Sequence, residues 1–294
     1  MKIASISVLL SLLLATQILF AQSVNIKPGI QDSLSKISSM IWKQKTDSAR
    51  IQASDIFYAK FHSVLSTNSN KDIPLDSIYG ITSIASDDGL MRIFTWNVPL
   101  SEGTNKYFGF IQLFRDSSIV IPLQSKITDP SDLSSKQFTP QLWYGAIYYK
   151  LIQVENAGKR VYILLGWDGY NSSSNRKFID IISIDPLGNV IFGMPVFKTE
   201  KGLKSRVVME FAEKANMLLR YDYLAIMVKK RNKIKKENAW LIVMDRLIPM
   251  DPSMEGFRKY YVPAGDTYDG YIFRDGFWVL VEDIDVVNKV NKIN

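Results

Sequence analysis

Apolar side chains recur with helical spacing along residues 32–66. Leu34, Ile37 and Ile41 follow one another at intervals of three and four residues, the repeat that places side chains on one face of a helix. A polar stretch at residues 44–48 interrupts this repeat, which then resumes to the end of the segment. The pattern predicts two helices or one kinked helix.

Beyond residue 74 the pattern changes to short runs rich in aromatic and β-branched residues, which is typical of strands. These runs are residues 90–98, 107–114, 142–154, 161–167, 178–184, 190–197, 206–211, 217–228, 239–248, 268–273 and 277–281. Turn residues separate them, as at Leu187-Gly188-Asn189 and Arg274-Asp275-Gly276, and no helical repeat lies between them. The sequence therefore predicts a mainly β fold, an antiparallel meander with an N-terminal helical segment. A sandwich, an irregular barrel or a partial propeller would each fit.

The first 21 residues have the layout of a secretory signal peptide. Lys2 is followed by an apolar run that ends at the small residue Ala21. We expect export to the periplasm or the medium, with cleavage near Ala21 and no membrane span in the mature chain. The predicted organisation is a signal peptide at 1–21, a helical segment at 22–73 and an antiparallel β domain at 74–294.

Cysteine and histidine usage excludes several chemistries. The chain has no cysteine and one histidine, His62. Disulfides, thiolate metal centres and a thiol nucleophile are therefore excluded, and a serine triad would have to use His62. A single histidine also excludes a His-rich metal site, so we expect no metal. The sequence has no phosphate-binding glycine loop, and we expect no cofactor.

Charge is concentrated in one octapeptide at residues 229–236. The chain contains 36 Lys and Arg against 29 Asp and Glu, and six of the basic residues lie here, which leaves 30 against 29 elsewhere. These six are Lys229, Lys230, Arg231, Lys233, Lys235 and Lys236. Apolar runs on both sides predict a basic hairpin tip. It would contact an anionic envelope surface or serve as a solvated turn. Few stacking side chains accompany the charges, so sequence-specific nucleic-acid binding is not favoured.

A polar loop at residues 166–177 is the other candidate binding site. Trp167 and Tyr170 could stack on a sugar ring, and Asp168 and Asn171 could supply hydrogen bonds or oxygen ligands for calcium. The spacing does not match the twelve-residue calcium loop. A long polar hairpin loop without a ligand is the alternative interpretation.

Carboxylates are the remaining route to catalysis, because glycoside hydrolysis needs two of them across a cleft. Those at or near predicted strand ends are Asp168, Asp180, Asp269, Asp275, Glu282 and Asp283. Nothing in their spacing identifies a pair, and aspartates commonly cap turns.

Four segments resemble a group of exported bacterial proteins that has no assigned activity. They are IFTWNVPL, WYGAIYYKLI, YILLGWDGYN and GDTYDGYIF, which begin at residues 93, 143, 162 and 265. The resemblance implies export and one unit of conserved length, and it transfers no catalytic residue. We expect a binding or cell-envelope-associated module whose partner is an anionic envelope surface or a glycan. The alternative is a carboxylate-dependent hydrolase acting on envelope or extracellular glycans.

Overall fold

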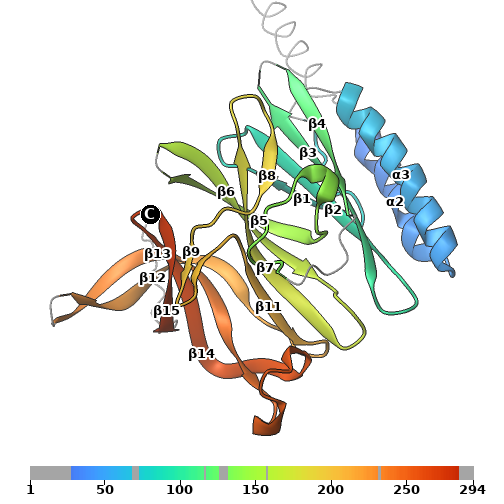
Figure 1. Cartoon of the computed structure of the whole chain (residues 1–294). Helices are drawn as coiled ribbons and strands as arrows, with labels where there is room; N and C mark the ends of the chain where they lie inside the picture. Colours follow the sequence, from blue (N-terminus) through green and yellow to red (C-terminus); the bar gives the residue numbers. More distant parts are fainter. Residues whose placement is uncertain are drawn as a thin grey trace, which may run out of the picture.

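Two helices and three β-sheets form successive layers (Figure 1). The computed structural model describes residues 28–67, 73–115, 117–125, 132–156, 158–230 and 233–284. The predicted N-terminal helices are present as α2 (Pro28–Lys43) and α3 (Asp47–Thr67). The break between them falls inside the polar stretch at residues 44–48, where the apolar repeat is interrupted.

The strands form three separate sheets. The first sheet consists of β1 (Thr82–Ala85), β2 (Met91–Pro99), β3 (Asn105–Phe114) and β4 (Ser118–Gln124). The central sheet has the order β11 (Val207–Ala212), β7 (Ser174–Ile184), β6 (Lys159–Asp168) and β5 (Ile147–Asn156), and β8 (Val190–Phe192) also pairs with β7. The third sheet has the order β10 (Gly202–Lys204), β9 (Phe197–Thr199), β15 (Phe277–Ile284), β14 (Tyr261–Arg274), β13 (Lys233–Pro249) and β12 (Leu219–Lys230).

The mainly β, antiparallel architecture is confirmed, and it is a layered sandwich. No sheet closes into a barrel within the described ranges. All pairings between the named strands are antiparallel except that of β15 with β9, which is parallel. The predicted turn at residues 274–276 is a two-residue hairpin in which Asp275 and Gly276 both have positive φ, 50° and 82°. This conformation matches the twist of the strands on either side.

The central sheet is buried on both faces, which explains the nearly continuous apolar run in β6. Val161, Ile163 and Leu165 pack in the core between the central and third sheets. The intervening residues Tyr162 and Leu164 pack in the core between the central and first sheets. A strand covered on both sides needs apolar residues at every position, not at alternate ones.

The helices cover the outer face of the first sheet (Figure 1). The rings of Phe57 and Trp96 meet edge to face with centroids 5.1 Å apart, and those of Phe61 and Phe110 do so at 5.8 Å. The indole N–H of Trp96 donates a hydrogen bond to Ser54 Oγ at 2.9 Å. Because this aromatic core is shared by α3 and the strands, the helices are part of the sheet's packing. Among the described residues, no helix is long and apolar enough to cross a bilayer.

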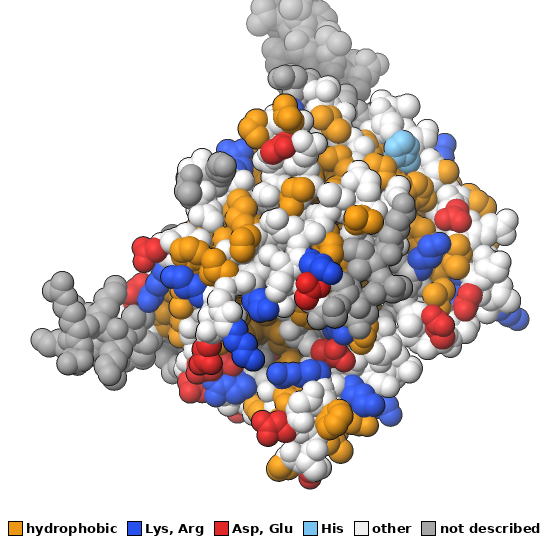
Figure 2. Space-filling model, viewed as in Figure 1, with side chains coloured by type: hydrophobic (Ala, Val, Ile, Leu, Met, Phe, Trp, Pro, Cys, Tyr) orange, Lys and Arg blue, Asp and Glu red, His pale blue; other side chains and the backbone are white. Residues whose placement is uncertain are grey.

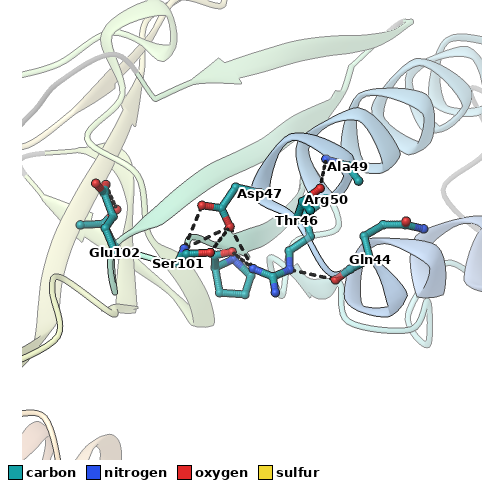
Figure 3. Close-up of polar contacts among 9 residues, drawn as sticks. Gln44, Thr46, Asp47, Ala49, Arg50, Ser101 and Glu102 are labelled. Atoms are coloured by element: carbon teal, nitrogen blue, oxygen red, sulfur yellow. Dashed lines mark hydrogen bonds and ion pairs between the residues drawn. The ribbon is translucent and has the colours of Figure 1, made fainter.

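A polar contact fixes the turn between the helices to the β2–β3 loop (Figure 3). The Ser101 backbone N–H donates to both carboxylate oxygens of Asp47, at 3.1 and 3.0 Å, and its hydroxyl donates to Asp47 Oδ1 at 2.8 Å. Arg50 donates to Asp47 Oδ1 and to the carbonyl of Pro99, both at 3.1 Å. The hydrogen bond from the Ser101 backbone is the main cause of the lowered pKa of Asp47.

The chain passes repeatedly between the central and third sheets. After β8 pairs with β7, the chain crosses to the third sheet and forms β9 and β10. It then returns to the central sheet for β11 and crosses once more to begin β12. Strands of the two sheets therefore alternate along the sequence over residues 190–230.

Candidate functional site

Asp168, one of the predicted site residues, is the centre of a buried hydrogen-bond network. The hydroxyl of Tyr107 on β3 donates to Asp168 Oδ1, and that of Tyr144 donates to Oδ2, both at 2.7 Å. The Tyr107 oxygen also accepts from the backbone N–H of Gly169 at 2.9 Å. Burial, followed by the charge of Asp168, raises the pKa of both tyrosines, so both phenols remain protonated donors. Asp168 thus joins the first sheet to the central sheet.

The other predicted loop residues lie beside this network. Asn171 forms a local turn, because its side-chain oxygen accepts from the backbone N–H groups of Ser173 and Ser174 at 2.8 and 3.0 Å. The guanidinium carbon of Arg176 lies 3.3 Å from the centroid of the Tyr170 ring and covers one of its faces. Trp167 is half-buried. The loop therefore uses several of its polar and aromatic groups internally, and its role in ligand binding stays a prediction.

Arg176 connects this network to an open cleft. Its Nη1 donates to the Tyr144 oxygen at 3.0 Å, and its Nε and Nη2 donate to Glu210 Oε2 at 3.1 and 3.0 Å. Ser174 Oγ donates to the other Glu210 oxygen at 2.8 Å. Arg176 and Glu210 belong to the neighbouring strands β7 and β11, where they are directly paired in register. The pair forms one wall of the cleft.

The charged cleft, as we call it, lies between β11 of the central sheet and β13 and β14 of the third sheet. It encloses about 690 Å³. Arg258, in the short 3-10 helix Arg258–Tyr260, and residues 132–134 complete its lining. Figure 2 shows acidic and basic side chains intermixed around a hollow in the lower half of the view. The volume is within the range of about 300–1,000 Å³ found for small-molecule sites.

Methionines supply much of the apolar lining of the charged cleft. Met209, Met217 and Met244 line it, and all three are at least nine-tenths buried. Methionine side chains are flexible and polarisable, and they adapt to ligands of different shape.

Fixed ion pairs occupy the opposite wall. Arg246 on β13 donates through Nε to Asp269 Oδ2 at 3.0 Å, and its Nη1 lies 2.8 Å from Asp283 Oδ1. The hydrogen bond with Asp269 is the main cause of the raised pKa of Arg246. Asp245, the preceding residue, accepts from the backbone N–H of Leu218 at 2.7 Å. These acidic and basic groups are held in place before any ligand arrives.

Arg258 differs from the other two arginines of the cleft. It is exposed, and its guanidinium carbon lies 4.4 Å from the centroid of the Tyr261 ring. Within the described part of the chain, no carboxylate lies within ion-pair distance of Arg258. Its charge is therefore oriented by an aromatic ring but not neutralised by an acid.

The candidate carboxylates have separate environments. Asp180 is buried in an ion pair with Arg206, with Oδ2 and Nε 3.1 Å apart. Asp275 occupies the hairpin turn, and Glu282 is exposed. Only Asp269 and Asp283 are brought together, by their shared partner Arg246.

The sequence predictions missed most of the residues that line the cleft. Glu210, Asp245, Arg246 and Arg258 were not candidates. One signal was present, because Asp245 and Arg246 interrupt the apolar run of β13, AWLIVMDRLIPM. In the described part of the chain, no group of three or more acidic or histidine side chains could hold a metal ion.

The basic octapeptide lies at the end of the β12–β13 hairpin, as predicted. The two strands stay in register up to the pairing of Lys230 with Lys233. Arg231 lies outside the described residues, as do the side chains of Lys229, Lys230, Lys233 and Lys235. Lys236 is exposed. Contact with an anionic surface stays a prediction.

Comparison with known proteins gives no match: no family model, no curated protein and no solved structure is significantly similar to this chain.

Proposed function

We propose that this protein is a binding module whose charged cleft holds a small amphiphilic carboxylate. One observation carries the proposal. Arg258, alone among the three arginines that line the cleft, has no carboxylate partner in the described part of the chain. An anionic group placed there would give Arg258 a counter-ion, and a guanidinium can bind both oxygens of a carboxylate.

The apolar part of the ligand would rest on the methionines. Met209, Met217 and Met244 line the same cavity as Arg258, so one small molecule can contact both. A fatty carboxylate and a short peptide with an apolar C-terminal residue share this chemistry. For either ligand, burial of apolar surface and charge-assisted hydrogen bonding to Arg258 would contribute to the free energy of binding.

A carboxylate-dependent glycan hydrolase is the second candidate, because Glu210, Asp245 and Asp269 all line the cleft. Binding is better supported than hydrolysis. Glu210 and Asp269 accept hydrogen bonds from guanidinium groups, and Asp245 accepts from a backbone N–H, so all three carboxylates already have partners within the protein. A glycoside hydrolase instead needs two carboxylates that act on the substrate from opposite sides of the scissile bond. Release of reducing ends from envelope glycans, abolished in Asp269→Asn, would favour the hydrolase.

Calorimetric titration with decanoate and with its uncharged amide tests the binding proposal. We expect decanoate to bind and decanamide to bind at least about tenfold more weakly, because a hydrogen bond to a charged group contributes about 1.5–3 kcal/mol. The same comparison between a hydrophobic dipeptide with a free C-terminus and its C-terminal amide tests whether the ligand is a peptide. Arg258→Ala should weaken binding of the carboxylate by a similar factor, whereas the neighbouring Lys259→Ala should leave it unchanged. Equal affinity for acid and amide, or no binding of any probe, would overturn the proposal.

We further propose that the protein acts outside the cytoplasm, in the periplasm or the medium. The basis is the signal-like layout of residues 1–21. N-terminal sequencing of the chain recovered from cell fractions is the test. A mature chain starting near Gln22 in the exported fraction supports export, and an uncleaved chain in the cytoplasm contradicts it.

Contact between the basic tip and an anionic envelope surface is a separate proposal. Replacing Lys229, Lys230, Lys233 and Lys236 by Gln should reduce retention on anionic liposomes at low salt, and the difference should shrink at moderate salt. Unchanged retention would mean that the charge serves solubility.

A further inference from the structure

A cluster of aromatic rings lies on the β12–β13 hairpin. Figure 1 shows this hairpin extending to one side of the other strands. Tyr221 and Tyr223 are two residues apart and therefore lie on the same face of β12. Trp240 on β13 is the cross-strand partner of Tyr223. The Tyr221 and Trp240 rings are stacked, with centroids 4.9 Å apart and planes inclined by 15°. The Tyr223 ring lies 5.4 Å from that of Trp240 and is tilted by 52°.

Tyr221 and Trp240 of this cluster line a cavity of about 380 Å³, which we call the aromatic groove. Its lining also includes Phe273 and Trp278 from the third sheet, Glu155 from β5, and the ion pair of Glu237 with Arg274, whose closest atoms are 3.4 Å apart. The groove therefore combines aromatic rings with charged hydrogen-bonding groups. The volume suits a single sugar ring or the end of an oligosaccharide.

Exposure distinguishes this cluster from the aromatic cores elsewhere. The side chain of Trp240 is 46% exposed, whereas Trp96, Trp143 and Trp278 are each at most 1% exposed. Packing within the protein leaves much of this large ring in water. Such a ring, combined with polar groups at its side, is suited to a ligand that has both apolar and hydroxylated faces.

We propose that the aromatic groove is a carbohydrate-binding site. The C–H face of a pyranose ring would stack on the exposed surface of Trp240. The Glu155 carboxylate, which is exposed, would accept hydrogen bonds from its hydroxyl groups. The indole N–H of Trp278 is buried with no acceptor among the described residues, and a hydroxyl at the bottom of the groove would supply one. Carboxylates beside the rings disfavour a nucleic-acid strand, whose phosphates they would repel.

This site is independent of the charged cleft. Trp240 and Asp245 both lie on β13, five residues apart, which corresponds to roughly 17 Å along an extended strand. A glycan could therefore bind while the charged cleft is empty or filled. Failure of either site would not imply failure of the other.

The test uses the full mature chain and a panel of soluble chito-, cello-, xylo- and manno-oligosaccharides, with affinity measured by calorimetry in moderate salt. Salt suppresses non-specific attraction between the basic tip and charged samples. We expect at least one family of oligosaccharides to bind, and Trp240→Ala to weaken that binding about tenfold. Trp240→Tyr, which keeps an aromatic ring, should restore part of the affinity.

Phe257→Ala is the matched control, because Phe257 is an aromatic residue that is 61% exposed and does not line the groove. It should leave glycan affinity unchanged. Thermal unfolding of each variant verifies that the fold is intact. Absence of binding to every glycan of the panel would overturn the proposal, as would equal affinity of the wild type and Trp240→Ala.

Discussion

The buried ion pair between Arg206 and Asp180 makes a specific stability prediction. The side chains of Arg206 and Asp180 are 1% and 7% exposed, and their closest atoms are 3.1 Å apart. Arg206 Nη1 also donates to the carbonyls of Leu133 and Lys136, at 2.6 and 2.8 Å, and its guanidinium carbon lies 4.6 Å from the centroid of the Phe138 ring. One guanidinium thus fixes residues 133–138 against the central sheet.

Arg206→Met keeps most of the apolar volume and removes the charge. The Asp180 carboxylate then remains buried without its counter-ion, and the carbonyls of Leu133 and Lys136 lose their donor. Removing one partner of a buried ion pair costs about 3–5 kcal/mol. In a chain of this size each kcal/mol corresponds to roughly 2–4 °C, so the melting temperature should fall by about 6–20 °C.

Urea unfolding followed by circular dichroism measures the change. Asp180→Asn in the Arg206→Met background should recover part of the loss, because it removes the unpaired charge. Arg115→Met is the control. Arg115 is exposed and donates to the carbonyls of Asp185 and Pro186, so its loss should cost less than about 1 kcal/mol. A cost below about 1 kcal/mol for Arg206→Met would refute the reasoning.

Three further predictions concern single contacts. The pKa of Asp47 is lower in the folded state than in the unfolded chain, so its interaction with Ser101 stabilises the protein above about pH 4. This stabilisation is lost as the pH falls further and Asp47 becomes protonated. The melting temperatures of wild type and Asp47→Asn should therefore differ at pH 7 and converge in acid. Gly109→Ala should cost about 1–3 kcal/mol in urea unfolding, because its Cβ would lie 2.6 Å from the backbone oxygen of Phe94. Asp168→Asn should lower the pKa of Tyr107 and Tyr144, so that both phenols ionise at a lower pH in an absorbance titration. The same substitution should lower the free energy of unfolding by about 1.5–3 kcal/mol.

Local patterns in the sequence predicted most of the secondary structure, but they missed β1, β4 and β10 and joined β8 to the start of β9 in one run. Helical spacing identified the segment that folds as α2 and α3, and the aromatic and β-branched runs identified the main strands. Turn residues placed the hairpin at Asp275 and Gly276. All of these features depend on residues close together in the chain, which is why a single sequence contains enough information.

Polar contacts between residues far apart in the sequence could not be predicted from such local patterns. Asp168 accepts from Tyr107, which is 61 positions earlier, and Arg176 pairs with Glu210 across neighbouring strands. Which strands become neighbours depends on the packing of whole sheets, so the partners of these charges could not be chosen in advance. The polar interruption at Asp245 and Arg246 marked a special place on β13 but did not indicate what faces it.

The alternation of strands between the central and third sheets has a mechanical consequence. Neither sheet is one continuous stretch of chain, so no single cut in the backbone would release either of them intact. Two bodies connected by several short crossings cannot swing apart about a hinge, which usually needs only one or two flexible connections. The walls of the charged cleft come from these two sheets. We therefore expect the cleft to be rigid and open before its ligand arrives, so that little of the binding energy is lost in ordering it.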